Sequence, residues 1–247
     1  MTCNNVCCAG ITPALQYTKQ YLQQHNIPLS DTPDWNTRHL LLDVPTFRPG
    51  FDQRTLDTLL SSLPRDTIIW GGNLESADDR QTVDLLKDEE YLTQNAAITA
   101  DCALKIALPK LKTTLPQSPA LIIGWGRIGK CLSQLLKAAG CPVMVAARKE
   151  TDRCALKSLG YPAVDCNHLW KSLSQFRLVF NTVPAMMIPE SDFPPIENIV
   201  AIDLASQKGM EGDHVIWARG LPGIHAPESA GTLIAETFLR KVKEVTA

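Results

Sequence analysis

The fold is decided by one short stretch, Ala120-Leu-Ile-Ile-Gly124-Trp-Gly126-Arg-Ile-Gly129, in which an apolar run leads into a glycine-rich turn. The run Ala120–Ile123 predicts a buried strand, and apolar residues then recur at helical spacing at Ile128, Cys131, Leu132, Leu135 and Leu136. In such a strand–turn–helix unit, the first glycine permits the turn, the second admits a pyrophosphate and the third lets helix and strand pack closely. We therefore predict dinucleotide binding, with a purely structural turn as the alternative; the binding residues are Gly124, Trp125, Gly126, Arg127, Ile128 and Gly129.

The α/β pattern continues to about residue 228. Strands are expected at residues 143–147, 178–180, 199–202 and 215–218, with helices between most of them. Alternating strands and helices of this kind build a doubly wound parallel sheet. Residues 119–228 are therefore predicted to form a C-terminal NADP-binding Rossmann domain.

A second, smaller α/β domain, of the flavodoxin-like type, is expected over residues 1–95. Its strands are predicted at residues 5–9, 39–44 and 67–70, with an amphipathic helix between the last two. An apolar helical course from about residue 80 to 110 indicates a connecting helix, which we assign to residues 96–118. The amphipathic helix 229–247 is expected to pack back on the first domain and complete it, as the substrate side of the protein.

Composition excludes several classes of protein. Lys and Arg number 24 and Asp and Glu 26 among 247 residues, so the net charge is −2 and no basic field attracts nucleic acid. No apolar run approaches the roughly 20 residues that span a bilayer, and the N-terminus lacks signal-peptide character. We expect a cytoplasmic protein that forms a homo-oligomer such as a dimer. No metal site is expected, because the cluster Cys3, Cys7 and Cys8 has no second group of ligands.

The end of the strand after the glycine motif predicts which nicotinamide cofactor binds. An acidic residue there would hydrogen-bond a free ribose 2′-hydroxyl, whereas this chain reads Ala147-Arg148-Lys149. Arg148 and Lys149 can pair with a 2′-phosphate, with Thr151 as a further donor, so NADP is favoured over NAD. The alternative is that the basic pair belongs to an ordinary solvated loop.

Three loops after later strands carry more specific motifs. They read Asn181-Thr-Val-Pro184, Asp203-Leu-Ala-Ser206 and Gly220-Leu-Pro-Gly223, the last followed by Ala226-Pro227 and Ala230-Gly231. Together with the glycine motif, these loops closely resemble the family of the dipicolinate synthase A subunit, the NADP-binding subunit of that enzyme, over about Ala120 to Glu244. Residues 95–101, Asn-Ala-Ala-Ile-Thr-Ala-Asp, look like the interdomain helix of that family.

The resemblance implies a reaction, a substrate and a partner. Members of this family are nicotinamide-dependent oxidoreductases that convert dihydrodipicolinate, a small cyclic dicarboxylate, to dipicolinate, the dicarboxylate of spores made during sporulation. The complete enzyme of the family adds a flavoprotein-like B subunit. The protein itself must place a ring C–H against the nicotinamide, exclude water and accept a proton.

The same loops supply the remaining candidate site residues. Residues at the nicotinamide end of the cofactor are expected to be Asn181, Thr182, Val183, Pro184 and Leu204. Ser206 can donate to a substrate carboxylate, and Asp203 either orders its loop, which we favour, or takes the substrate proton. His225 is a candidate general acid or base because imidazole titrates near neutral pH; its alternative role is that of an exposed loop histidine.

Two other functions stay open. A 2-hydroxyacid dehydrogenase shares this fold, but it needs a cation just after the strand that ends at Ile202, where this chain has Asp203-Leu-Ala-Ser206. Lys208 and Arg219 are the nearest cations in the sequence. The second alternative is an NADP-binding regulatory or assembly subunit without catalysis of its own.

Overall fold

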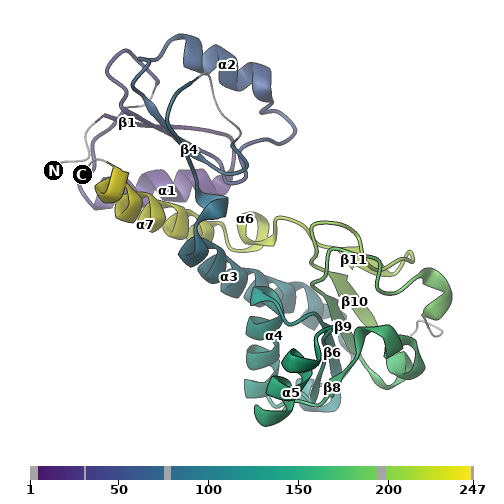
Figure 1. The fold of residues 1–247 in the computed structure, drawn as a ribbon. Helices are drawn as coiled ribbons and strands as arrows, with labels where there is room; N and C mark the ends of the chain where they lie inside the picture. The colour runs from purple at the N-terminus through teal and green to yellow at the C-terminus, as the bar shows by residue number, and fades with distance from the viewer. Residues whose placement is uncertain (1–4, 31, 75–78, 194–198, 246–247) are drawn as a thin grey trace. The chain divides into compact units, whose positions relative to one another are not determined.

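The computed structural model describes residues 5–30, 32–74, 79–193 and 199–245, which divide into two compact units (Figure 1). Unit 1 joins Met1–Asn95 to Pro222–Ala247, and unit 2 comprises Ala96–Leu221. Each unit contains a parallel sheet with helices, so the predicted two-part α/β class is confirmed. Across the described ranges, no helix has the length and apolar character needed to cross a bilayer.

The sheet of unit 2 has the strand order of a Rossmann fold. Its described strands are all parallel and run β11-β10-β9-β6-β7-β8. The chain starts at β6 in the middle, moves out to β8 and returns to β9 on the other side of β6, so the order reverses between β6 and β9. The strands are β6 (Ala120–Ile123), β7 (Val143–Ala146), β8 (Ala163–Val164), β9 (Leu178–Asn181), β10 (Val200–Asp203) and β11 (Val215–Trp217).

Both faces of this sheet are covered. Helix α4 (Arg127–Ala138) lies on the face to which Ile122 points, and α5 (Glu150–Ser158) follows β7. The 3₁₀ helix η4 (Cys166–Gln175) contributes Leu169 and Leu173 to a core that also holds Leu121 and Ile123. Because successive side chains of β6 point to opposite covered faces, the whole strand is buried, which is why its sequence is continuously apolar.

Unit 1 has the strand order of a flavodoxin-like sheet, β2-β1-β3-β4-β5. Its helices α1 (Pro13–Gln24) and α7 (Pro227–Val245) lie side by side on one face, and α2 (Gln53–Ser61) covers the other (Figure 1). Gly231 lets α1 and α7 approach, because a Cβ there would collide with the Ala14 carbonyl oxygen. The strands are β1 (Val6–Ala9), β2 (Leu29–Ser30), β3 (His39–Leu42), β4 (Ile68–Gly71) and β5 (Thr82–Asp84).

The segment between the two sheets differs from the helix expected at residues 96–118. Helix α3 begins at Glu89 and ends at Ala107, and it is preceded by strand β5 and the short 3₁₀ helix η1 (Leu85–Lys87). Two further 3₁₀ helices follow, η2 (Leu108–Lys110) and η3 (Leu115–Gln117). Pro109 explains the end of α3, since proline lacks the N–H that a continuing helix needs and disfavours helical backbone at the residue before it.

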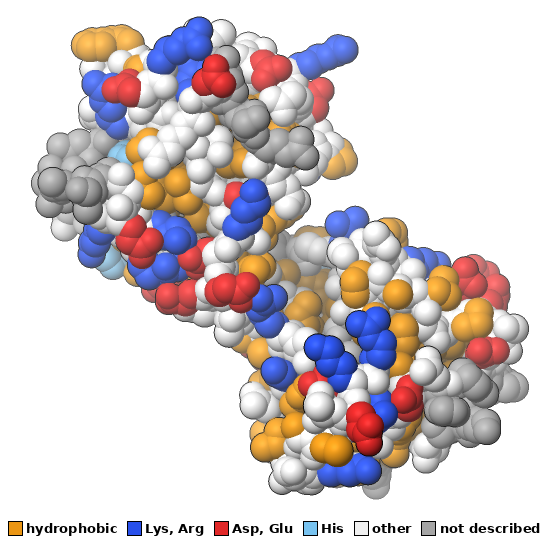
Figure 2. All heavy atoms as spheres, in the orientation of Figure 1, with side chains coloured by type: hydrophobic (Ala, Val, Ile, Leu, Met, Phe, Trp, Pro, Cys, Tyr) orange, Lys and Arg blue, Asp and Glu red, His pale blue; other side chains and the backbone are white. Residues whose placement is uncertain are grey.

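Cysteines and charges are dispersed over the molecule. The cysteines of the described residues are all free thiols, whereas Cys3 lies outside those residues. Within the same part of the chain, no three His, Cys, Asp or Glu side chains are arranged to hold a metal ion. Figure 2 shows acidic and basic side chains interspersed on the visible faces of both units, as the small net charge would lead one to expect.

Asp88 ties the start of α3 to the end of α7 within unit 1. Its Oδ1 accepts hydrogen bonds from the Tyr91 amide (2.8 Å) and from Arg240 Nη2 (2.6 Å), and its Oδ2 lies 3.1 Å from Lys241 Nζ. Burial raises the pKa of this carboxyl, but the hydrogen bonds from the amide and the two cations outweigh it and hold the pKa at about 2.

We predict that Asp88→Ala lowers the free energy of unfolding by about 2 kcal/mol at pH 7, because it removes a helix cap and a charge-assisted acceptor. Since the folded pKa of Asp88 lies below its ordinary 3.8, this contribution is complete above about pH 4 and is lost as the pH falls toward 2. Urea unfolding between pH 7 and 3 should therefore show the gap to wild type narrowing. As a control, Glu90→Gln removes an exposed Arg240 partner and should cost less than about 1 kcal/mol; equal losses would contradict the assignment.

Candidate dinucleotide-binding site

The three glycines of the turn between β6 and α4 have different surroundings. Gly124 has a φ of +107°, which favours glycine, and a Cβ there would collide with the Thr182 hydroxyl. A Cβ on Gly129 would collide with the carbonyl oxygen of Gly124. By contrast, no atom of another described residue lies within 4 Å of the position that a Cβ would take on Gly126. Two of the glycines therefore serve the packing of the turn, and the middle one leaves open space.

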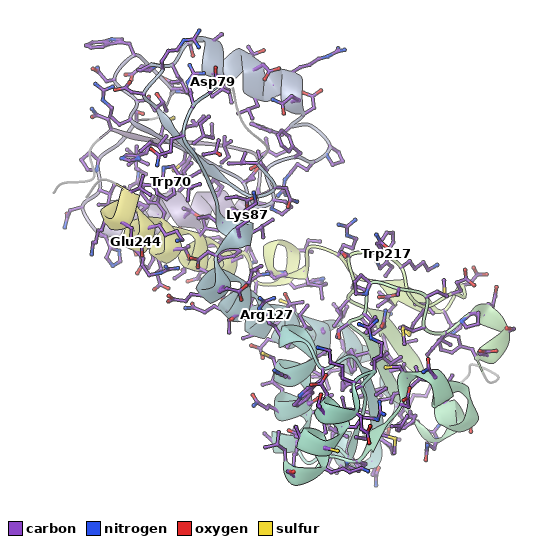
Figure 3. All side chains as sticks on the ribbon, in the orientation of Figure 1. Trp70, Asp79, Lys87, Arg127, Trp217 and Glu244 are labelled. Atoms are coloured by element: carbon purple, nitrogen blue, oxygen red, sulfur yellow. The ribbon has the colours of Figure 1, made fainter. Side chains whose placement is uncertain are left out.

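This open space lies at the N-terminus of α4. Gly126 is the N-cap residue, and no side chain caps the helix there. The N–H groups of a first helical turn have no partners within the helix and carry the positive end of its dipole. The exposed Arg127, labelled in Figure 3, begins the helix and adds a cation beside these groups. A pyrophosphate fits such an uncapped terminus.

A pocket of about 750 Å³ opens at the carboxyl ends of β6, β7 and β9. This is the side of the sheet, and the place in the strand order, where open α/β sheets bind ligands. Its volume lies within the usual range of ligand sites, roughly 300–1,000 Å³. The wall contains Gly124, Trp125, Gly126, Ala147, Arg148, Lys149, Asp152, Cys166, Asn167, Val183, Pro184, Ala185, Met186 and Met187.

The basic pair at the end of β7 lines this pocket. Arg148 and Lys149 are both exposed, and no ion pair joins either of them to another described residue. Arg153 behaves differently, since its Nη1 donates to the carbonyl oxygens of Ala147 (2.8 Å) and Arg148 (2.6 Å) and lies 3.0 Å from Asp165 Oδ2. Arg153, whose charge is balanced by Asp165, therefore holds the turn. Arg148 and Lys149 keep unbalanced charges that a ligand could pair with.

Seven residues of the pocket wall were not among the predicted site residues, and Asp152 is the charged one: Ala147, Asp152, Cys166, Asn167, Ala185, Met186 and Met187. Asp152 lies in the first turn of α5, which brings its carboxylate back to the pocket that the strand end also lines. The strand end itself has no acid. Arg148 lies before α5 begins at Glu150, so helical periodicity does not link it to residue 152, and no pattern in the sequence points to Asp152. Among the described residues, the pocket wall therefore contains one acidic residue and two basic ones.

Asn181 and Asp203 form a buried clamp between the loops that follow β9 and β10. Asn181 Nδ2 donates to Asp203 Oδ1 and to the Val183 carbonyl oxygen, both at 2.9 Å, and its Oδ1 accepts from the Val183 amide at 3.0 Å. Asp203 Oδ2 accepts from the amides of Gly209 (2.6 Å) and Met210 (2.9 Å). Every polar atom of the two side chains is thereby engaged, so the geometry favours the loop-ordering role of Asp203 over that of a proton acceptor.

Other contacts complete these loops. Thr182 Oγ1 donates to the Ile123 carbonyl oxygen at 2.9 Å, so the hydroxyl joins β9 to the glycine turn. Trp217, labelled in Figure 3, donates from Nε1 to the Ala205 carbonyl oxygen at 3.1 Å. A Cβ on Gly209 would collide with the Ala185 carbonyl oxygen, so only glycine fits where the two loops meet. The sequence motifs did not single out Gly209.

Other predicted site residues lie in four places. Val183 and Pro184 line the pocket, whereas Leu204 is buried, and its amide donates to the Asn181 carbonyl oxygen at 2.8 Å. Ser206 is exposed on the loop after β10. His225 is exposed at the end of the short helix α6 (Leu221–His225) and is grouped with unit 1 rather than unit 2.

We predict that Asp203→Asn lowers the free energy of unfolding by about 2–4 kcal/mol, because an amide NH₂ would face backbone donors that now bond a carboxylate. Urea unfolding of the purified variant measures the loss. The control is Asp213→Asn, an exposed carboxylate on the same unit, which should change stability by less than about 0.5 kcal/mol. A variant as stable as wild type but without turnover would instead assign Asp203 to proton transfer.

Known proteins are similar to this chain in sequence and in fold. No protein-family model matches the chain. The dipicolinate synthase A subunit of Bacillus subtilis (strain 168) is 24% identical over 204 residues, covering 76% of this chain and 69% of the relative. The crystal structure of the dipicolinate synthase A subunit from Bacillus halodurans matches with a TM-score of 0.81 at 19% identity, over 97% of each chain. The crystal structure of the dipicolinate synthase A chain from Bacillus subtilis matches with a TM-score of 0.79 at 18% identity, over 100% of this chain and 98% of its own.

A more distant match shows how widely the fold occurs. A transhydrogenase from Sinorhizobium meliloti gives a TM-score of 0.68 at 10% identity over 98% of this chain and 94% of its own. The sequence match to the dipicolinate synthase A subunit also extends beyond Ala120–Glu244, the stretch whose motifs carry the resemblance. That resemblance is confirmed: the chain is similar in sequence and in fold to the A subunit of dipicolinate synthase, and it has a dehydrogenase-type Rossmann fold.

Proposed function

We propose that the protein is an NAD(P)-dependent oxidoreductase that converts dihydrodipicolinate to dipicolinate. The observation that carries this proposal is the pocket at the reversal of strand order, into which Gly126 and the uncapped start of α4 open. A Cβ would fill the space above Gly126, so the absence of one fits the close approach of a pyrophosphate. The similarity to a protein named as a part of dipicolinate synthase supports the substrate class.

Each candidate site residue has a proposed role in this reaction. A bound nicotinamide would supply the acceptor for the hydride that leaves a ring carbon of the substrate. Ser206 has a hydroxyl that can donate to a substrate carboxylate, and His225 is proposed as the base that takes the ring proton. Asp203 and Asn181 act as positioning residues, since their hydrogen bonds fix the loop on which Ser206 stands.

NADP is the proposed form of the cofactor. Arg148 and Lys149 line the pocket without ion-pair partners among the described residues, and a ribose 2′-phosphate would provide them with one.

The relative from Bacillus subtilis is named as one subunit of its synthase, which implies at least one more subunit in that enzyme. We therefore propose that the protein works with a second, flavoprotein-like subunit.

The direct test is a coupled assay with the cyclic lysine-pathway intermediate, NADP and the candidate flavoprotein-like subunit. The expected result is a product with the absorbance of an aromatic pyridine, formed together with NADPH. His225→Gln should lower kcat at least tenfold if the imidazole takes the proton. No pyridine product with the partner supplied, despite measurable NADPH binding, would instead favour a regulatory or assembly subunit.

The basic pair generates a second prediction, measured by calorimetric titration. Arg148→Gln should weaken NADPH binding about tenfold by removing a charge-assisted hydrogen bond, and leave NADH binding unchanged. Asp152→Asn should strengthen NADPH binding severalfold, because it removes a negative charge beside the 2′-phosphate. Lys157→Gln, on α5 but outside the pocket wall, is the matched control. Equal affinities of the wild-type protein for NADPH and NADH would rule out the preference.

The glycine turn supplies a matched pair of substitutions. Gly126→Ala should keep the unfolding midpoint of wild type, because its Cβ meets nothing, and weaken cofactor binding at least tenfold. Gly129→Ala should lower stability, because its Cβ meets the Gly124 carbonyl oxygen. Thermal unfolding and calorimetry separate the two effects. Cofactor binding undisturbed by Gly126→Ala would show that the turn is only structural.

A further inference from the structure

A small pocket of about 120 Å³ lies at the amino ends of β9 and β10, the edge of the sheet opposite to the glycine turn. Among the described residues its wall contains three cations and no acidic residue: Lys110, Leu111, Lys112, Thr113, Arg177, Ile199 and Val200. The proposed oxidoreductase reaction uses none of these residues. The charge of the wall therefore calls for an explanation of its own.

The backbone fixes Arg177 at this edge. Its amide donates to the Pro119 carbonyl oxygen at 2.8 Å, and its carbonyl oxygen accepts from the Val200 amide at 2.9 Å. Arg177 therefore sits where β6, β9 and β10 begin, with its side chain half-buried. Lys110 ends η2, and Lys112 follows it in the turn toward β6. The two lysines and the arginine come from segments far apart in the sequence.

These three cations have no counter-charge in the part of the chain that the structure describes. No ion pair there joins Lys110, Lys112 or Arg177 to a carboxylate, whereas Arg153 of the same unit pairs with Asp165 at 3.0 Å. Like charges around one partly enclosed space repel one another, and an anion bound there would reduce this repulsion. The guanidinium group can bind two oxygens at once, and the ammonium groups add point charges.

We propose that this pocket binds a small tetrahedral oxyanion of the phosphate type. Its volume equals about four water molecules at roughly 30 Å³ each, which suits a single such anion and is too small for a dinucleotide. The Thr113 hydroxyl, which lies 2.7 Å from Ser118 Oγ, adds a polar group to the wall. The pocket is separate from the glycine turn, because the two open at opposite edges of the same sheet.

The test is a calorimetric titration of the full chain with inorganic phosphate, against sodium chloride of equal ionic strength. We expect saturable phosphate binding that weakens about tenfold in Arg177→Gln and also falls in Lys112→Gln. The double variant Arg148→Gln/Lys149→Gln, altered only at the cofactor pocket, should retain this binding. Circular dichroism of each variant verifies that it is folded, and Lys112→Gln, in an exposed turn, keeps the test usable if Arg177→Gln unfolds.

Two outcomes would overturn the proposal. One is the absence of saturable phosphate binding to the wild-type protein. The other is binding that disappears in the Arg148→Gln/Lys149→Gln variant and persists in Arg177→Gln and Lys112→Gln, because the phosphate would then occupy the glycine turn. Neither outcome depends on whether the protein oxidises dihydrodipicolinate.

Discussion

The candidate site depends on one close approach, that of Gly129 to the carbonyl oxygen of Gly124. Because no side chain separates them, the first turn of α4 rests directly on the end of β6. The N-terminus of the helix is thereby fixed beside the reversal point of the sheet. Gly126 lies between these two residues and has open space where they have none. The packing of the turn and the opening for a ligand thus follow from a single backbone arrangement.

Around this turn, side chains with hydrogen-bond or ion-pair partners hold the loops in place. Basic side chains without an ion-pair partner among the described residues line the pocket. Asp203 and Asn181 use all their polar atoms to join two loops, and Arg153 is neutralised by Asp165 while it holds the turn after β7. Arg148 and Lys149, five and four residues before Arg153 in the sequence, keep exposed charges. A buried polar group without partners is costly, so evolution can leave groups unpaired only where solvent or a ligand reaches them.

The sequence predicts those parts of the structure that repeat a local pattern. The buried run Ala120–Ile123 and the helix after it carry strong periodicity, and the structure has both elements. Strand β5 was not predicted from the sequence, because its three half-buried residues, Thr82–Asp84, are too few to show a periodicity and precede a long helix. Two features could be found only from the tertiary structure. Asp152 reaches the pocket wall through the first turn of α5. Lys110 and Arg177 line one pocket although they are distant in the sequence.

Asp152 bears on cofactor choice, and its position is consistent with the proposed preference for NADP. It lies with Glu150 in the first turn of α5, where carboxylates stabilise the positive end of the helix dipole. An acid that recognises a ribose 2′-hydroxyl stands at the end of the strand itself, and there the chain has Ala147 followed by Arg148. The helix therefore accounts for Asp152 without a bound ribose. No such internal reason accounts for Arg148 and Lys149, which lie before the helix begins at Glu150 and add positive charge near its already positive end. A 2′-phosphate between them would offset that repulsion, and this makes the basic pair the more informative part of the pocket.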